Sequence, residues 1–223
     1  MIKIFSLTVL SVLSFLWSAP GWAGSLKVQV MDQQARPLAS AVLTLKGPPG
    51  KTPAELKADM DQRDQEFVPR VLAVHSNTQV KFPNSDNIRH QVYSFSAAKR
   101  FELRLYSGTP SDPLLFDKPG VVVLGCNIHD WMVGYIYVTE EPWFAVTDDE
   151  GVLKFDDMPA GQYSATLWHP RARDMQPVSG GDIVVSAGDS SKAFTFEVEP
   201  GDDEEPAAPP SAFGDAFHKA VHP

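Results

Sequence analysis

The feature that most constrains the fold of this chain is a series of short apolar runs separated by turn residues. The runs are rich in Val, Phe and Tyr, and none is long or periodic enough to indicate a helix. They lie at residues 71–74, 80–82, 92–95, 101–105, 121–124 and 133–138. Short runs at this spacing predict an all-β sandwich or barrel.

A second group of apolar runs lies outside this region, at both ends of the chain. Residues 26–46 predict two strands, and a further pattern of strands and turns begins near residue 146. Its predicted strands are 152–155, 163–168, 183–185 and 194–198. Two strands cannot form a stable sheet alone, so we expect 26–46 to pair with the strands beyond 146. The region between them would then be an inserted domain; the alternative is two domains in series.

The two ends of the chain carry different signals. Residues 1–23 combine a positive charge at Lys3, an apolar run over 4–17, and small residues at Gly21 and Ala23. This pattern predicts a secretory signal peptide and a periplasmic protein. The alternative is a membrane anchor, although the run is short for a span. Residues 199–223, rich in Asp, Glu, Pro and Ala, predict a disordered tail. Its His218 and His222 are either solvated or transient copper ligands.

Charge and cysteine content narrow the function. The formal net charge of −9 argues against nucleic acid, which requires a basic surface, and against anionic membrane surfaces. The chain has a single cysteine, Cys126, and therefore no internal disulfide. An exposed thiol is a liability in an oxidising compartment unless it is buried, paired between chains or bound to metal. Cys126 is thus the residue that most needs an explanation.

The segment from Cys126 to Met132 offers a thiolate, the imidazole of His129 and a thioether within seven residues. These are soft ligands that suit copper. A second imidazole would complete the set, and His90 is the best candidate because adjacent strands would bring 82–92 beside 125–132. Each residue also has an ordinary alternative, as a buried thiol, a surface imidazole or a packed methionine. A Cys–His nucleophile pair lacks a third orienting group, and the Cys-x-x-Cys-His motif of c-type haem is absent.

These motifs resemble a cupredoxin (blue-copper) domain over residues 52–140. The resemblance rests on 67–69, on the run 80–86 with His90 after it, and on the Cys-x-x-His-x-x-Met spacing of 126–132. That short ligand loop is similar to the amicyanin type, and the whole arrangement is similar to cupredoxin-like proteins of methylamine utilisation. The fold that the resemblance implies is a Greek-key β-sandwich.

The resemblance also implies a role for each site residue. His90, Cys126 and His129 would be the equatorial ligands of one copper ion, and Met132 the weak axial ligand. His129 would lie nearest the surface, with Ile128 and Trp131 as an apolar patch for electron transfer. Gln91 departs from the family, which often has Asn or another bracing residue after the first histidine. An acid beside a ligand histidine, as at Asp130, is also unusual.

Other Met and His residues are weaker candidates for ligands of this site. Met60 either adds a thioether at the metal edge or simply packs, and packing is the simpler interpretation. His75 is expected at a strand end on the surface, and His169 is expected to be structural. The segments 25–50 and 141–198 resemble a carboxypeptidase-regulatory-like, transthyretin-like β-sandwich, through the turn at 147–151 and the Pro-x-Gly-x-Tyr of 159–163.

The sequence therefore predicts a non-enzymatic periplasmic copper protein that carries one electron at a time. Its partner would be a redox protein of unknown identity, and no membrane span would remain after signal removal. Two alternatives stay open: a copper carrier or chaperone without redox cycling, and a non-catalytic scaffold that binds a partner.

Overall fold

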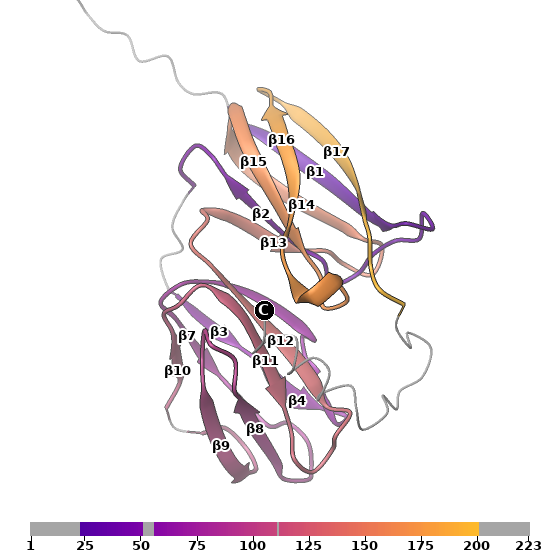
Figure 1. The fold of residues 1–223 in the computed structure, drawn as a ribbon. Helices are drawn as coiled ribbons and strands as arrows, with labels where there is room; N and C mark the ends of the chain where they lie inside the picture. Colours follow the sequence, from indigo (N-terminus) through magenta and orange to yellow (C-terminus); the bar gives the residue numbers. More distant parts are fainter. Residues whose placement is uncertain (1–22, 51–55, 111, 201–223) are drawn as a thin grey trace, which may run out of the picture.

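The computed structural model describes residues 23–50, 56–110 and 112–200, and the regular secondary structure of these residues is almost entirely β-strand (Figure 1). Its only helical segment is one 3-10 turn, η1 (Arg173–Met175). None of the described residues belongs to a helix with the length and apolar character of a membrane span. The all-β prediction is confirmed. The predicted signal peptide up to residue 22, and the predicted tail beyond residue 200 with His218 and His222, lie outside the described residues.

Two sheets form the upper sandwich of Figure 1 from strands at both ends of the chain. In one sheet, β1 (Ala23–Asp32) lies between β14 (Val152–Pro159) and β17 (Asp189–Phe196). The other sheet has the order β13 (Trp143–Val146), β2 (Val42–Lys46), β15 (Gly161–Trp168), β16 (Val178–Val185).

The intervening chain forms the lower sandwich. Its larger sheet has the order β6 (Val71–His75), β12 (Val133–Thr139), β11 (Gly120–Gly125), β8 (His90–Ser94), β9 (Phe101–Tyr106). Its smaller sheet has the order β10 (Leu114–Phe116), β7 (Thr78–Lys81), β3 (Lys57–Asp59). A short hairpin joins β4 (Asp61–Arg63) to β5 (Glu66–Val68).

Strand pairing relates the two ends of the chain. Strand β1 pairs antiparallel with β14, where Lys27 lies opposite Lys154, and parallel with β17. Strand β2 pairs with β13 and β15, so that Leu43 lies opposite both Ala145 and Leu167. The chain thus leaves the upper sheets after β2 and returns to them at β13, which is the connectivity expected of an inserted domain. The exact domain limits and the transthyretin-like identity of the upper sandwich stay predictions.

Alternation along the strands builds the core of each sandwich. In β1, Leu26, Val28 and Val30 are fully buried while the residues between them are more exposed, as the two-residue period of a strand requires. They pack against Leu43 and Leu45 of the facing sheet. Each fully buried aliphatic side chain of this size stabilises the fold by about 1.5–3 kcal/mol. A separate apolar cluster fills the lower sandwich.

A third cluster joins the two sandwiches. Trp168, at the end of β15, is fully buried, and its ring packs against Tyr135 and Tyr137 of β12 at centroid distances of 5.9 and 5.4 Å. The indole N–H donates a hydrogen bond of 2.9 Å to the carbonyl of Met175. Strand β12 therefore connects the 126–132 loop, which it directly follows, to the interface with the upper sandwich.

Several strand limits differ from the sequence prediction. The strand expected at 183–185 extends over 178–185, and the strand expected at 194–198 spans 189–196. Strand β13 at 143–146 was not predicted. The segments that extend β16 and β17, at 178–182 and 189–193, are rich in Ser, Gly and Asp, which favour turns in isolation. Pairing with neighbouring strands overrides that local preference here.

Candidate metal centre

The predicted ligands come from three adjacent strands of the larger lower sheet. Cys126 directly follows β11, and Met132 directly precedes β12, so the loop between these antiparallel neighbours carries three of the four residues. His90 is the first residue of β8, which lies on the other side of β11. The sequence prediction that strand pairing brings the two segments together is confirmed.

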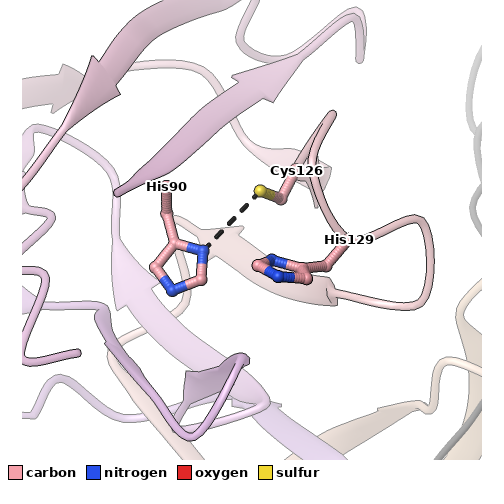
Figure 2. A group of neighbouring side chains, drawn as sticks. All are labelled: His90, Cys126 and His129. Atoms are coloured by element: carbon pink, nitrogen blue, oxygen red, sulfur yellow. Dashed lines mark hydrogen bonds between the residues drawn. The ribbon is translucent and has the colours of Figure 1, made fainter. Parts of the chain in front are cut away.

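The side chains of His90, Cys126 and His129 converge on one point (Figure 2). One ligand atom from each residue lies within 4.8 Å of the other two, and all three residues are buried. The thiol sulfur of Cys126 is 3.8 Å from Nδ1 of His90, and the two imidazole ring centroids are 5.0 Å apart. A single ion placed between them is within reach of a sulfur and two nitrogens.

One nitrogen of this cluster lacks the partner that buried polar atoms normally have. Nδ1 of His129 is buried and makes no hydrogen bond, although most buried polar side-chain atoms make at least one. Burial and the nearby His90 lower the pKa of His129, which keeps the imidazole neutral. Since metal ligands must be deprotonated, a neutral imidazole beside a free thiol fits a bound metal ion.

Met132 closes the ligand loop. Its backbone N–H donates a hydrogen bond of 2.9 Å to the carbonyl of His129, and its side chain is buried in the same apolar cluster as Cys126. A thioether in this cluster fits the role of a weak axial ligand, and the bond itself stays a prediction. Met60 is also fully buried in this cluster, which agrees with its interpretation as a packing residue.

Nε2 of His90, the ring nitrogen on the side away from Cys126, contacts the carboxylate of Asp86, a residue with no predicted role at the site. Nε2 of His90 lies 2.6 Å from a carboxylate oxygen of Asp86. The same carboxylate accepts the backbone N–H groups of Asp64 and Gln65, at 2.7 and 3.0 Å. Burial alone would raise the pKa of Asp86, but these hydrogen bonds and the imidazole hold it below its usual value. The spacing of four residues between Asp86 and His90 was the available signal.

Asn84 shapes the loop that leads to His90. Its amide group donates to the carbonyls of Ile88 and Tyr106, both at 2.9 Å. Its side-chain oxygen accepts the backbone N–H of Asp86 at 3.0 Å. Asn84 therefore fixes the turn that carries Asp86, which gives a structural reason for the spacing of Asn84, Asp86 and His90 in the sequence.

Gln91 provides a brace despite its departure from the family pattern. Its side-chain oxygen accepts a 2.9 Å hydrogen bond from the amide of Asn127, the residue after Cys126. Its own amide donates to Glu102 at 2.8 Å. The two ligand segments are thus tied to each other at the surface, directly beside the cluster.

Apolar side chains flank the most exposed ligand. Ile128 and Trp131 keep 48% and 38% of their surfaces exposed, whereas His129 keeps 9%. The rings of His129 and Trp131 are 5.1 Å apart. The apolar patch that the resemblance implied therefore lies against the imidazole nearest to solvent.

The other described histidines are not part of this centre. His75 ends β6 and bonds to the carbonyl of Ser76 at 2.9 Å. His169 is buried in the upper sandwich, where Nε2 donates to the carbonyl of Ala39 and Nδ1 accepts the N–H of Arg171, both at 3.1 Å. Burial lowers the pKa of His169 to about 3. Its structural role, expected from the sequence, agrees with these contacts.

Comparison with known proteins returns copper proteins among solved structures. No family model and no curated protein matches this sequence. A purple cupredoxin from Nitrosopumilus maritimus is 21% identical, with a TM-score of 0.33 over 37% of this chain and 99% of its own. A copper-containing nitrite reductase from Thermus scotoductus is 24% identical, with a TM-score of 0.36 over 51% of this chain and 28% of its own.

Amicyanin is a further match. A reduced amicyanin mutant is 17% identical, with a TM-score of 0.34 over 43% of this chain and 99% of its own. The solved structures similar to this chain thus include cupredoxins, the family that the sequence motifs resemble.

Proposed function

We propose that this protein binds one copper ion through His90, Cys126, His129 and Met132 and transfers single electrons in the periplasm. The observation that carries the proposal is the buried convergence of a thiol and two imidazoles, one with an unpartnered nitrogen. Two histidines and a cysteine in a plane with a distant methionine define the electron-transfer type of copper site.

The donor set favours copper over zinc. Zinc sites in proteins use Cys, His and carboxylate ligands, and a catalytic zinc keeps one position for water. Here the fourth candidate is a buried thioether, which is a soft donor that suits copper. The bound copper would supply a single redox step between its two oxidation states.

The surroundings of the site suit electron transfer rather than ion delivery. Both ligand segments are braced, since Asn84 shapes the loop before His90 and Gln91 bonds Asn127 beside Cys126. A braced site changes little when the ion changes charge. The patch of Ile128 and Trp131 offers a redox partner an apolar surface directly over His129.

Copper loading of the mature protein tests the proposal. With one equivalent of Cu(II), we expect an intense visible thiolate-to-copper band and reversible reduction. A protein that remains colourless and retains only Cu(I) would contradict electron transfer and favour the carrier alternative. Fractionation of cells that express the full chain tests the periplasmic location, and recovery in the cytoplasmic fraction would overturn it.

A further inference from the structure

We propose that Asp86 is a positioning residue of the metal centre, which fixes the tautomer of His90 and strengthens this imidazole as a ligand for Cu(II). The effect on copper rests on the function proposed above. The effect on the tautomer exists in the metal-free protein and is tested without copper.

The two nitrogens of His90 have different partners. Nε2 lies 2.6 Å from Asp86 Oδ2, and Nδ1 lies 3.8 Å from the sulfur of Cys126. An ionised carboxylate only accepts hydrogen bonds, so Nε2 must carry the proton. Nδ1 of the neutral ring then has a free lone pair that is directed into the cluster. Asp86 thereby leaves His90 ready to bind metal.

A strained turn holds Asp86 in place. Asp64 and Gln65 join β4 to β5 with φ values of 53° and 62°, a left-handed conformation that is uncommon for residues other than glycine. Their N–H groups donate to the two carboxylate oxygens of Asp86. The hairpin thus holds the carboxylate of Asp86, and Asn84 holds its backbone N–H, so the position of Asp86 does not depend on His90 alone.

The negative charge of Asp86 affects the relative affinity of the site for Cu(II) and Cu(I). A carboxylate that accepts the outer N–H of a ligand imidazole makes that imidazole a stronger donor. A stronger donor stabilises the more highly charged ion, so Asp86 favours Cu(II) over Cu(I). Loss of such an outer partner typically weakens metal binding 10- to 100-fold. We expect Asp86→Asn to weaken Cu(II) binding by about this factor and Cu(I) binding by less, which raises the reduction potential.

The test compares Asp86→Asn with Asp61→Asn in the full mature protein. Asp61 is a matched control, because its side chain is 14% exposed against 12% for Asp86. It also lies in the adjacent hairpin, where it bonds to Arg63 and Ser85 and to none of the four proposed ligands. Both substitutions remove one negative charge, but only the first reaches a ligand.

Two measurements separate the outcomes. Nitrogen NMR of the metal-free protein should show His90 protonated at Nε2 in the wild type and in Asp61→Asn. In Asp86→Asn the neutral amide oxygen is a weaker acceptor and the amide nitrogen can donate instead, so the Nε2 resonance should shift or the proton should move to Nδ1. Voltammetry of the copper form should show a higher potential for Asp86→Asn, by about 59 mV for each tenfold change in the ratio of Cu(II) to Cu(I) affinity. The control should shift less.

Equal potential shifts in the two variants would overturn the proposal, as would His90 nitrogen resonances in Asp86→Asn that are the same as in the wild type. If Asp86→Asn does not fold, Asp86→Glu retains the charge and displaces the carboxylate by one methylene. That variant should still change the potential, and an unchanged value would count against a positioning role. A wild type with the expected tautomer but no thiolate-to-copper band would reject the proposed function and leave the positioning of His90 by Asp86 intact.

Discussion

The buried polar side chains discussed for the two sandwiches differ in their hydrogen-bond partners. In the upper sandwich, His169 uses both ring nitrogens in hydrogen bonds, and Trp168 donates its N–H to a backbone carbonyl. At the end of the lower sandwich, Nδ1 of His129 has no partner, and the Cys126 thiol makes only a long contact of 3.8 Å. The difference indicates that the first set stabilises the fold, whereas the fold holds the second set ready for a metal ion.

Thr147 illustrates the structural type of polar group. Its hydroxyl donates to the carbonyl of Leu38 at 2.7 Å and accepts the N–H of Ala41 at 2.9 Å. It ties the chain just before β2 to the chain just after β13. From this difference we expect substitutions in the upper sandwich to change the free energy of unfolding but not copper binding. Substitutions at the metal centre should change copper binding and have little effect on the free energy of unfolding.

The largest expected effect is at Cys126. Cys126→Ser should abolish the visible thiolate-to-copper band completely, because a serine hydroxyl stays protonated and cannot replace the thiolate. The measurement is the visible spectrum after addition of one equivalent of Cu(II). Thr147→Val is the matched control in the upper sandwich, and it should keep the band while it lowers the free energy of unfolding by about 1–3 kcal/mol. A band that survives in Cys126→Ser would refute the site.

Trp168 should carry the largest effect on stability. Trp168→Ala removes a fully buried ring from the cluster between the sandwiches and should lower the free energy of unfolding by about 3–5 kcal/mol. Denaturant titration of the metal-free protein measures the change. Trp168→Phe retains most of the packing and loses the hydrogen bond to Met175, so it should cost less. A large change in the copper spectrum of either variant would contradict the separation of the two regions.

The sequence predicted the elements whose patterns are local. The apolar runs gave the all-β class, and the spacing within 126–132 identified Cys126 and His129 as neighbours, which the structure confirms. His90 followed from the expectation that adjacent strands align two distant segments. The first two predictions succeeded because strand alternation and loop spacing are short-range properties of a chain, whereas the prediction for His90 needed an assumption about which strands are adjacent.

The features that the sequence missed depend on contacts between distant segments. Asp86 acquires its proposed role only when the turn at Asp64 and Gln65 folds against it, 22 and 21 residues away in sequence. Gln91 seemed to lack a bracing function until Asn127 was placed beside it. After its first residue, Val178, strand β16 continues with Ser, two glycines and Asp, which form a strand here because β15 pairs with them. Local sequence preference carries no information about such partners.

His169 should give the upper sandwich a pH dependence of its own. Burial, followed by the nearby positive charge of Arg171, lowers its pKa from 6.5 to about 3 in the folded protein. The unfolded chain therefore binds a proton between these values that the folded chain does not. Stability is retained above pH 6.5 and falls as the pH decreases towards 3, by at most roughly 5 kcal/mol in total at 1.36 kcal/mol per pKa unit.

The measurement is the free energy of unfolding of the metal-free protein as a function of pH. His169→Gln removes the titrating group and can still donate to the carbonyl of Ala39, so its profile should be flatter than that of the wild type over this range. Other groups titrate in both proteins, and the difference between the two profiles isolates His169. Parallel profiles would show that the buried imidazole does not impose this cost.

The smallest expected effect on stability is at the surface of the metal centre. Ile128 is 48% exposed, so Ile128→Ser should change the free energy of unfolding by no more than about 0.5 kcal/mol. It should also leave the copper band unchanged, because the side chain is not a ligand. Electron exchange between copies of the protein should nevertheless become slower, since the polar side chain disrupts the apolar patch over His129. Val184→Ser, on the exposed surface of the upper sandwich, is the control that should leave the exchange rate unchanged. Equal rates in wild type and Ile128→Ser would show that electrons leave the site by another surface, and the apolar patch would then need a different explanation.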